Sequence, residues 1–170
     1  MSTLSIDIRR ARLEDAADIA GVHDAAWRYA YRGLLPGVEL EKMVERRGGE
    51  WWARAIRRHV FVLVLEVGGQ VVGYATLGPS RMRTLPYKGE IYELYVQPEY
   101  QGLGLGRRLF QAARRTLGDL KLDGAVVRAL AGNETAVAFY GRVGGRKVAE
   151  SGERIAGTVL PVQVFAWPEG

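Results

Sequence analysis

The sequence predicts an α/β fold (α+β in some schemes) with a mixed β-sheet at its centre and helices on both faces. Short runs rich in β-branched and aromatic residues alternate with segments whose apolar residues recur every three or four positions, as expected for strands and helices. Two of the β-rich runs flank Gly68-Gly69, and a two-residue glycine turn in that setting is typical of an antiparallel hairpin. Later strands are separated by single helices, which indicates parallel crossovers in the same sheet.

In the first half of the chain, the pattern predicts one strand, three helices and a hairpin. Apolar residues at helical spacing run from residue 14 to residue 31, and Gly33 and Pro36 end that helix. Gly48-Gly49 separates the two shorter helices that follow. The expected elements are a strand at 5–10, helices at 14–31, 38–47 and 50–58, and hairpin strands at 60–67 and 70–77.

In the second half, strands and helices alternate. A basic loop at 78–89 precedes a strand at 91–96, and a helix then runs from the glycines at 102–106 to about residue 117. Asn133 is a favourable N-cap for a helix at 134–143. The remaining expected strands are 124–130, 146–150 and 158–167. The helix after the glycines is expected to bury a stripe made of Leu105, Leu109, Ala112, Ala113 and Thr116.

Length and composition are those of one ordinary globular domain covering residues 1–170. The chain contains no cysteine, which excludes a disulfide scaffold, a thiolate nucleophile and a zinc site built on cysteine. Its 2 histidines argue against a histidine-rich centre, so no metal is expected. No run of about 18 apolar residues is present and residues 1–12 lack an apolar signal core, so we expect a cytoplasmic protein without a membrane segment.

The most informative stretch is Gln101-Gly102-Leu103-Gly104-Leu105-Gly106, between a strand and a helix. Alternating glycines remove the Cβ atoms that would keep a ligand off the backbone. The first N–H groups of the following helix lack intrahelical acceptors, so the junction predicts an anion site. Arg107 and Arg108 add positive charge at a helix start that ordinarily favours acidic residues. A pyrophosphate would fit there.

Two common phosphate motifs do not match this stretch. A P-loop requires Gly-Lys-Ser/Thr at the helix start, whereas Gly106 is followed by Arg107. The dinucleotide fingerprint requires glycine at its first, third and sixth positions. The sixth position is Arg107 counted from Gly102 and Leu109 counted from Gly104.

The stretch instead resembles a known acyl-CoA motif. Residues 90–106, EIYELYVQPEYQGLGLG, are similar to the acyl-CoA motif of the GNAT N-acetyltransferase superfamily, whose signature Gln/Arg-x-x-Gly-x-Gly/Ala is matched by Gln101, Gly104 and Gly106. Residues 133–140, NETAVAFY, resemble the family's Asn-x-x-Ala-x-x-x-Tyr helix at the family's spacing, and 27–36 resemble its substrate-side helices. The resemblance implies a single GNAT-like domain with splayed parallel strands at the cofactor site.

The resemblance also implies acetyl-CoA as co-substrate. Backbone N–H groups of residues 103–107 would hold its pyrophosphate, and the pantetheine arm would pair with the strand end at 94–96. An N–H group there would polarise the thioester carbonyl. The implied cofactor-binding residues are Leu94, Tyr95, Val96, Gln101, Gly102, Leu103, Gly104, Leu105, Gly106, Arg107, Arg108, Asn133 and Tyr140.

Two residues are candidates for the proton transfers. Tyr140 matches the family's tyrosine that donates a proton to the leaving thiolate, and a phenol stays protonated at neutral pH. The alternative is core packing beside Phe139. Glu93 stands in an otherwise apolar, aromatic strand, where a carboxylate needs a function or a partner. It is either the base, acting directly or through water, or half of a structural ion pair. Some family members place a Glu on the next strand, where this chain has Arg128.

The acceptor is expected to be a primary amine, attacking directly without a covalent acyl-enzyme, because neither Cys nor a Ser/His/Asp constellation is present. It is a small molecule, a protein N-terminus or a lysine. Trp27 and Tyr31, one helical face with His23, are candidate acceptor-site residues, as is Tyr92; core packing is the alternative.

Two other functions remain open from the sequence. A non-catalytic acyl-CoA sensor would use the same glycine loop. The net charge of +5 also suits a nucleic-acid binder, but the sequence shows no zinc-finger or RRM signature, so no nucleic-acid partner is expected. Homodimers are common in the family and are possible here.

Overall fold

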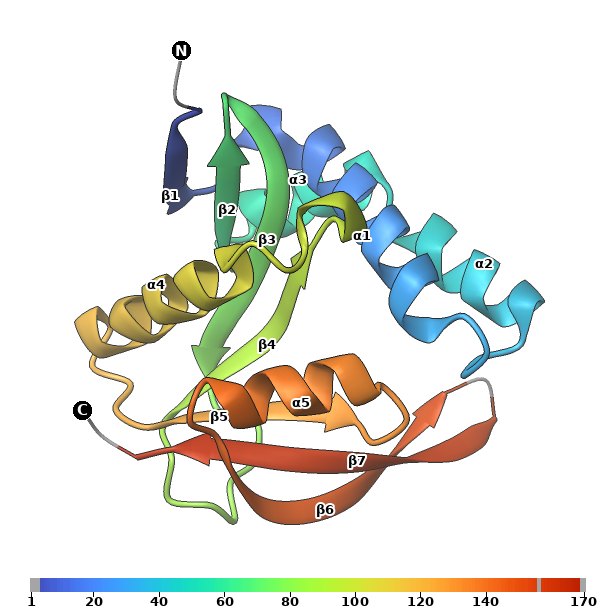
Figure 1. The fold of residues 1–170 in the computed structure, drawn as a ribbon, viewed down its shortest axis with the longest axis vertical. Coiled ribbons are helices and arrows are strands. Elements are labelled where there is room, and N and C mark those ends of the chain that lie inside the picture. The colour runs from blue at the N-terminus through green and yellow to red at the C-terminus, as the bar shows by residue number, and fades with distance from the viewer. Residues whose placement is uncertain (1–3, 156, 169–170) are drawn as a thin grey trace.

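The computed structural model describes residues 4–155 and 157–168, which build one seven-stranded sheet with the strand order β1-β2-β3-β4-β5-β7-β6 (Figure 1). The elements follow one another along the chain as β1 (Ile6–Arg10), the 3-10 turn η1 (Leu13–Asp15), α1 (Ala16–Tyr31), α2 (Gly37–Arg46), α3 (Gly49–Arg57), β2 (Phe61–Val67), β3 (Gln70–Pro79), β4 (Gly89–Val96), the 3-10 turn η2 (Pro98–Tyr100), α4 (Leu105–Asp119), β5 (Ala125–Leu130), α5 (Glu134–Arg142), β6 (Arg146–Ile155) and β7 (Thr158–Trp167). The predicted α/β fold with a mixed sheet is therefore confirmed.

Strands β1 to β4 are antiparallel, as are β5, β7 and β6, and the two groups meet where β4 runs parallel to β5. Only Gly89↔Ala125 and Glu90↔Val126 pair across that junction. Beyond them the two strands separate, and Figure 1 shows β4 rising away from β5 while β5 and β7 cross the lower part of the molecule. The central sheet therefore contains an opening between β4 and β5.

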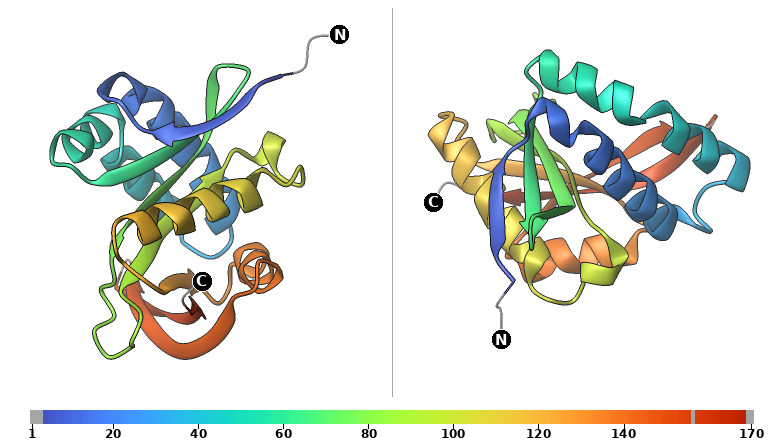
Figure 2. Two further views of the ribbon diagram at one scale, coloured as in Figure 1. Left: turned by 90° about the vertical axis from the view of Figure 1, so that its left-hand side faces the viewer. Right: turned by 90° about the horizontal axis from the view of Figure 1, so that it is seen from above.

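Helices cover both faces of the sheet, as the sequence predicts. Along β2, Leu63 and Leu65 pack in the same cluster as α4, while Val62 and Val64 pack with α1 and α3, because neighbouring side chains of a strand point to opposite faces. Figure 2 shows α1, α2 and α3 on the other side of the sheet from α4 and α5. We call these the α1–α3 face and the α4–α5 face.

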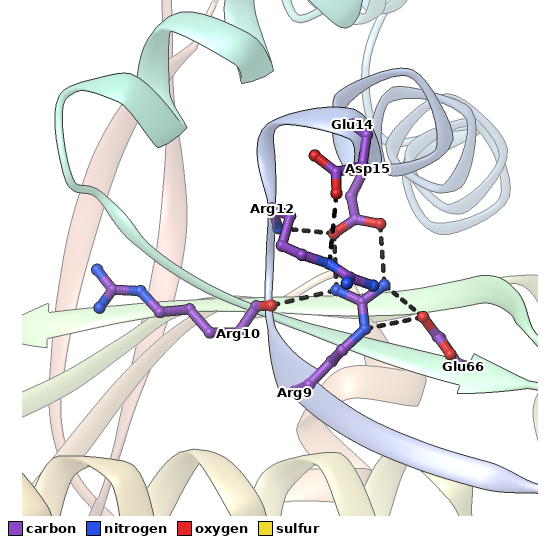
Figure 3. A network of polar contacts seen from close by, with 6 residues as sticks. All are labelled: Arg9, Arg10, Arg12, Glu14, Asp15 and Glu66. Carbon is purple, nitrogen blue, oxygen red and sulfur yellow. Dashed lines mark hydrogen bonds and ion pairs between the residues drawn. The ribbon is translucent and has the colours of Figure 1, made fainter.

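An ion-pair network joins the first strand to the helices (Figure 3). Arg9 on β1 donates to both carboxylate oxygens of Asp15, at 2.8 and 3.0 Å, and to Glu66 on β2. Asp15 also accepts from the Arg12 backbone N–H at 2.7 Å, and the bond from Arg9 is the main reason that the pKa of Asp15 lies below its ordinary value. The network fixes the start of α1, and through it the helix that borders the opening in the sheet.

Two expectations for individual elements were wrong in detail. Strand β6 extends to Ile155 rather than ending near residue 150, because β7 pairs with it along its whole length although its side chains there are exposed and give no alternating pattern. On α4, Thr116 is only half-buried and its hydroxyl donates to the Ala112 carbonyl, while Phe110 and Leu117 occupy the core. None of the helices in the described part of the chain is long and apolar enough to cross a bilayer.

Candidate functional site

The opening between β4 and β5 begins at a β-bulge. The β3–β4 register changes from Leu77↔Ile91 to Thr76↔Glu93, which leaves Tyr92 as an extra residue on β4. Because a bulge bends and twists the strand that carries it, β4 leaves β5 directly after Glu90. A pocket of about 670 Å³ lies at the opening. It is lined by Ala26, Tyr29, Ala30, Arg32, Leu34, Leu94, Tyr95, Val96, Gln101, Gly102, Gly104, Gly106, Arg107, Gly132, Asn133, Glu134, Thr135, Ala136, Phe139, Tyr140, Arg142 and Val143.

The glycine loop forms one wall of this pocket. Gly102 and Gly104 have φ values of +81° and +78°, a conformation that strongly favours glycine, and no atom lies within 4 Å of where their Cβ atoms would stand. Helix α4 begins directly after Gly104, and Arg108 is the residue whose N–H reaches back to the Gly104 carbonyl, at 3.3 Å. The preceding N–H groups at the start of α4 therefore have no helical acceptor, and they form an uncovered cradle for an anion.

The side chain of Gln101 connects this loop to β4. Its Nε2 donates to the Val96 carbonyl at 3.0 Å. The Gln97 N–H donates to Val72 on β3, so by the alternation of an antiparallel ladder Tyr95 faces β3 while the backbone groups of Leu94 and Val96 face the opening. This open strand edge offers N–H donors directly beside the pocket.

Tyr140 closes the α4–α5 side of the pocket. It lies on α5, which Asn133 caps by accepting the Ala136 N–H at 3.2 Å. Its ring is buried and stacked on Phe139, with 5.3 Å between the ring centroids. Burial, with a smaller effect of Tyr31, raises the pKa of the Tyr140 phenol above its ordinary value. The hydroxyl is therefore protonated at neutral pH and can act as a proton donor in the pocket.

Glu93 does not line this pocket, although it points to the same face of β4 as Tyr95, which does. Its carboxylate accepts two bonds from Arg47, at 2.8 and 2.6 Å, and one from the Tyr74 hydroxyl at 2.9 Å. Both side chains are only partly exposed, Arg47 by 22% and Glu93 by 14%. Of about four acceptor positions on a carboxylate, three are occupied and one is left for a further donor.

Aromatic residues of α1 and β4 cluster beside the pocket. The hydroxyls of Tyr31 and Tyr95 are hydrogen-bonded at 2.8 Å, and the Trp27 ring lies 4.8 Å from that of Tyr31. Tyr95 lines the pocket, whereas Trp27 and Tyr31 lie behind it. Tyr92, the bulged residue, points elsewhere: its hydroxyl donates to the Pro79 carbonyl, and Arg81 covers its ring at 4.5 Å.

Beside Glu93, buried polar atoms lack partners among the described residues. They are both ring nitrogens of His23, the indole nitrogens of Trp27 and Trp52, and the Thr76 hydroxyl. His23 is fully buried, and burial is the main cause that lowers its pKa from 6.5 to about 4, with Arg47 adding to it. His23 is therefore neutral at pH 7.

We expect His23 to make the protein acid-sensitive. Between pH 6.5 and pH 4 the unfolded chain binds a proton at this residue while the folded chain does not, so stability falls as the pH falls through that window. The difference between the two pKa values corresponds to about 3 kcal/mol of unfolding free energy at pH 4. Urea unfolding of the wild type and of His23→Leu at pH 7, 5.5 and 4 measures the difference. The same pH dependence of the unfolding free energy in both proteins would contradict it. Asp15 also loses stabilising effect as the pH falls from about 5, but both proteins contain it, so its effect cancels in the difference.

The structure brings together most of the residues expected at the cofactor site. Ten of them line the pocket: Leu94, Tyr95, Val96, Gln101, Gly102, Gly104, Gly106, Arg107, Asn133 and Tyr140. Leu105 instead packs in the core, while Leu103 and Arg108 are exposed. Sequence reasoning chose Trp27 and Tyr31 on this helix as candidate acceptor-site residues but did not identify Ala26, Tyr29 and Ala30 of α1, which line the pocket. The spacing of these three residues is that of any amphipathic helix and gives no specific signal.

Comparisons with known proteins agree with this geometry. The sequence model of the Acetyltransferase (GNAT) family matches residues 20–145. The uncharacterized N-acetyltransferase YuaI of Bacillus subtilis is 32% identical over 164 residues, which are 96% of this chain and 94% of that protein. The PaiA N-acetyltransferase of Thermoplasma acidophilum, crystallised with coenzyme A, has a TM-score of 0.76 at 21% identity and covers 94% of this chain and 98% of its own. The yncA acetyltransferase structure from Salmonella typhimurium, with acetyl-CoA, has a TM-score of 0.65 at 22% identity, over 96% and 93% of the two chains.

Proposed function

Because the chain belongs to the GNAT acetyltransferase family, we propose that it is an N-acetyltransferase in which acetyl-CoA and a primary amine are bound together and react directly. The family makes it an acyltransferase; the amine acceptor and the direct attack are the proposal. One observation supports it most: the glycine loop, the open edge of β4 and the Tyr140 hydroxyl all meet in one pocket.

The residues of this pocket fit acetyl-CoA, whose thioester supplies an activated acetyl group. The cradle formed by Gly102, Gly104 and the start of α4 suits a pyrophosphate, since it offers N–H groups without helical acceptors and its two glycines carry no Cβ atoms. Arg107 and Arg142 on the pocket wall add positive charge. The edge of β4 at Leu94 and Val96 suits an extended amide-bearing arm, because it lacks a neighbouring strand. An N–H group of that edge is positioned to bind a carbonyl oxygen as it gains negative charge.

Two residues account for the proton movements. Tyr140 donates the proton that the departing thiolate needs, and its raised pKa keeps that proton available at neutral pH. Glu93 accepts the proton that the attacking ammonium must lose, directly or through a water, at the one acceptor position that Arg47 and Tyr74 leave free. The two residues belong to opposite faces of the opening, so they serve the two ends of the reaction.

We expect Glu93→Gln to lower kcat about a hundredfold without changing the affinity for CoA. A stability loss will accompany it, because Arg47 is left without its carboxylate. The double variant Arg47→Met/Glu93→Leu removes the pair as a whole and serves as the control, since replacing both partners of a partly buried ion pair by apolar groups restores stability. If the double variant recovers turnover as well as stability, Glu93 is a structural residue and not the base.

A panel of amines tests the function itself. Purified protein, acetyl-CoA and each amine are mixed, and release of the CoA thiol is followed against a blank without amine. The panel contains polyamines, free amino acids, their carboxamides, and short peptides with a free N-terminus or a single lysine. Amine-dependent thiol release with an N-acetylated product supports the proposal. Tight binding of acetyl-CoA without release for any amine would favour a sensor instead.

A further inference from the structure

Arg128 lies beside the opening in the sheet, on the α1–α3 face. It follows Val126, the last residue of β5 that pairs with β4, by two positions. Its strand neighbours Val126 and Leu130 pack in the cluster that contains Tyr31 and Leu40, so Arg128, in the same alternation, points to that face. On β4, Glu93 and Tyr95 point to the same face, where Tyr74 and Arg47 bind Glu93. Glu93 on β4 and Arg128 on β5 therefore lie on opposite sides of the opening.

The guanidinium of Arg128 lacks a partner among the described residues. Its buried Nε–H donates to no acceptor, and no carboxylate of the described chain lies within 4 Å of the guanidinium. The unpartnered buried atoms do not include its two terminal nitrogens, so the end of the guanidinium can be reached from solvent. A partly buried cation without a partner is costly, and it is the kind of group that recognises a charged ligand.

Two other arginines near the opening are paired with carboxylates. Arg47 binds Glu93 with both terminal nitrogens. Arg81 donates from its side chain and its backbone to the fully buried Glu90, at 2.7 and 2.9 Å. Of Arg47, Arg81 and Arg128, Arg128 alone has no carboxylate within 4 Å among the described residues.

The pocket with the glycine loop, the start of α4 and Tyr140 is also lined by Ala26, Tyr29 and Ala30 of α1, whereas Glu93 and Arg128 do not line it. On the α1–α3 face, an amine that reaches the edge of β4 passes Glu93 and Arg128. We propose that Arg128 binds a carboxylate of the acceptor, and that the acceptor is a primary amine that carries such a carboxylate. This inference rests on the proposed function and adds the substrate class. A planar guanidinium with two free terminal nitrogens can bind a carboxylate through parallel hydrogen bonds.

The test uses matched acceptors. Free amino acids are compared with their carboxamides, and peptides with aspartate or glutamate as first residue are compared with the same peptides carrying asparagine or glutamine. The carboxylate member of a pair is expected to have a kcat/KM about thirtyfold higher, since a hydrogen bond to a charged group contributes on this scale. Preference within the first set identifies a free amino acid, and preference within the second an acidic peptide end. Equal rates within every pair would overturn the proposal.

Variants of Arg128 test whether this residue causes the preference for acceptors with a carboxylate. Arg128→Gln is expected to raise KM about thirtyfold for the carboxylate acceptor and to leave kcat, the KM of the carboxamide and the CoA affinity unchanged. Arg128→Lys keeps the charge and should recover part of the loss. A general structural role would instead change both members of a pair equally and lower the melting temperature.

A binding measurement separates this proposal from the proposed function. Calorimetry with CoA present follows the binding of an N-acetylated amino acid and of its amide to the wild type and to Arg128→Gln. Binding of the acid alone, lost in Arg128→Gln, supports the carboxylate site even if no amine is acetylated. Equal binding of acid and amide, or no binding of the acid, overturns it even if other amines are acetylated.

Discussion

Replacing Tyr140 with Phe is expected to lower kcat about a thousandfold and to leave the affinity for CoA unchanged. The substitution removes one oxygen from a side chain that is otherwise packed against Phe139, Phe110 and Trp167, so the pocket keeps its shape. What is lost is the proton that burial keeps on the phenol at neutral pH. Steady-state turnover and CoA calorimetry on the same preparation measure the two quantities.

Tyr87→Phe is the matched control for this experiment. It removes the same hydroxyl from a half-buried tyrosine that does not line the pocket, and turnover should not change. A Tyr140→Phe enzyme with full turnover would show that Tyr140 is only a packing residue. A parallel loss of CoA affinity and kcat would show that it acts in binding and not as the acid.

Gly104→Val is expected to weaken CoA binding on the order of a hundredfold. Gly104 precedes α4 with a φ of +78°, and a β-branched residue is strongly disfavoured in that conformation, at a cost of about 1–3 kcal/mol. We expect the loop to turn its N–H groups away to escape the strain, and the new side chain to enter the space proposed for the pyrophosphate. Calorimetric titration with CoA gives the change in affinity.

Gly118→Ala is the control within the same helix. Gly118 has no positive φ, and no atom lies within 4 Å of an added Cβ. We expect unchanged CoA affinity and a gain of about 0.5–1 kcal/mol in stability, as alanine replaces glycine inside a helix. Wild-type affinity in Gly104→Val would show that the glycine loop does not hold the cofactor.

Local signals explain why so much of the fold could be predicted. The Gly68-Gly69 turn has φ values of +60° and +80°, and the strands around it pair as the alternation indicated. The glycine loop and the start of α4 are determined by the six residues from Gln101 to Gly106. Such features depend only on residues close in sequence, and a sequence pattern can predict them for that reason.

The features that escaped prediction depend on contacts between distant residues. Arg47 lies 46 positions from Glu93, and Tyr31 lies 64 positions from Tyr95. The local sequence around each residue therefore gives no sign of its partner. Sequence reasoning left open an ion pair for Glu93 but did not identify its partner Arg47, which directly follows α2. The bulge at Tyr92 could not be predicted from the sequence either, because a bulge exists only relative to the register of the paired strand β3.

The two residue pairs between β4 and β5 have a thermodynamic consequence. The four strands before that seam and the three after it form separate hydrogen-bonded blocks, and little backbone bonding holds one to the other. A ligand bound along the open edge of β4 would form hydrogen bonds with backbone groups that have no strand partner there. By mass action, we expect such a ligand to raise the stability of the sheet as its occupancy rises.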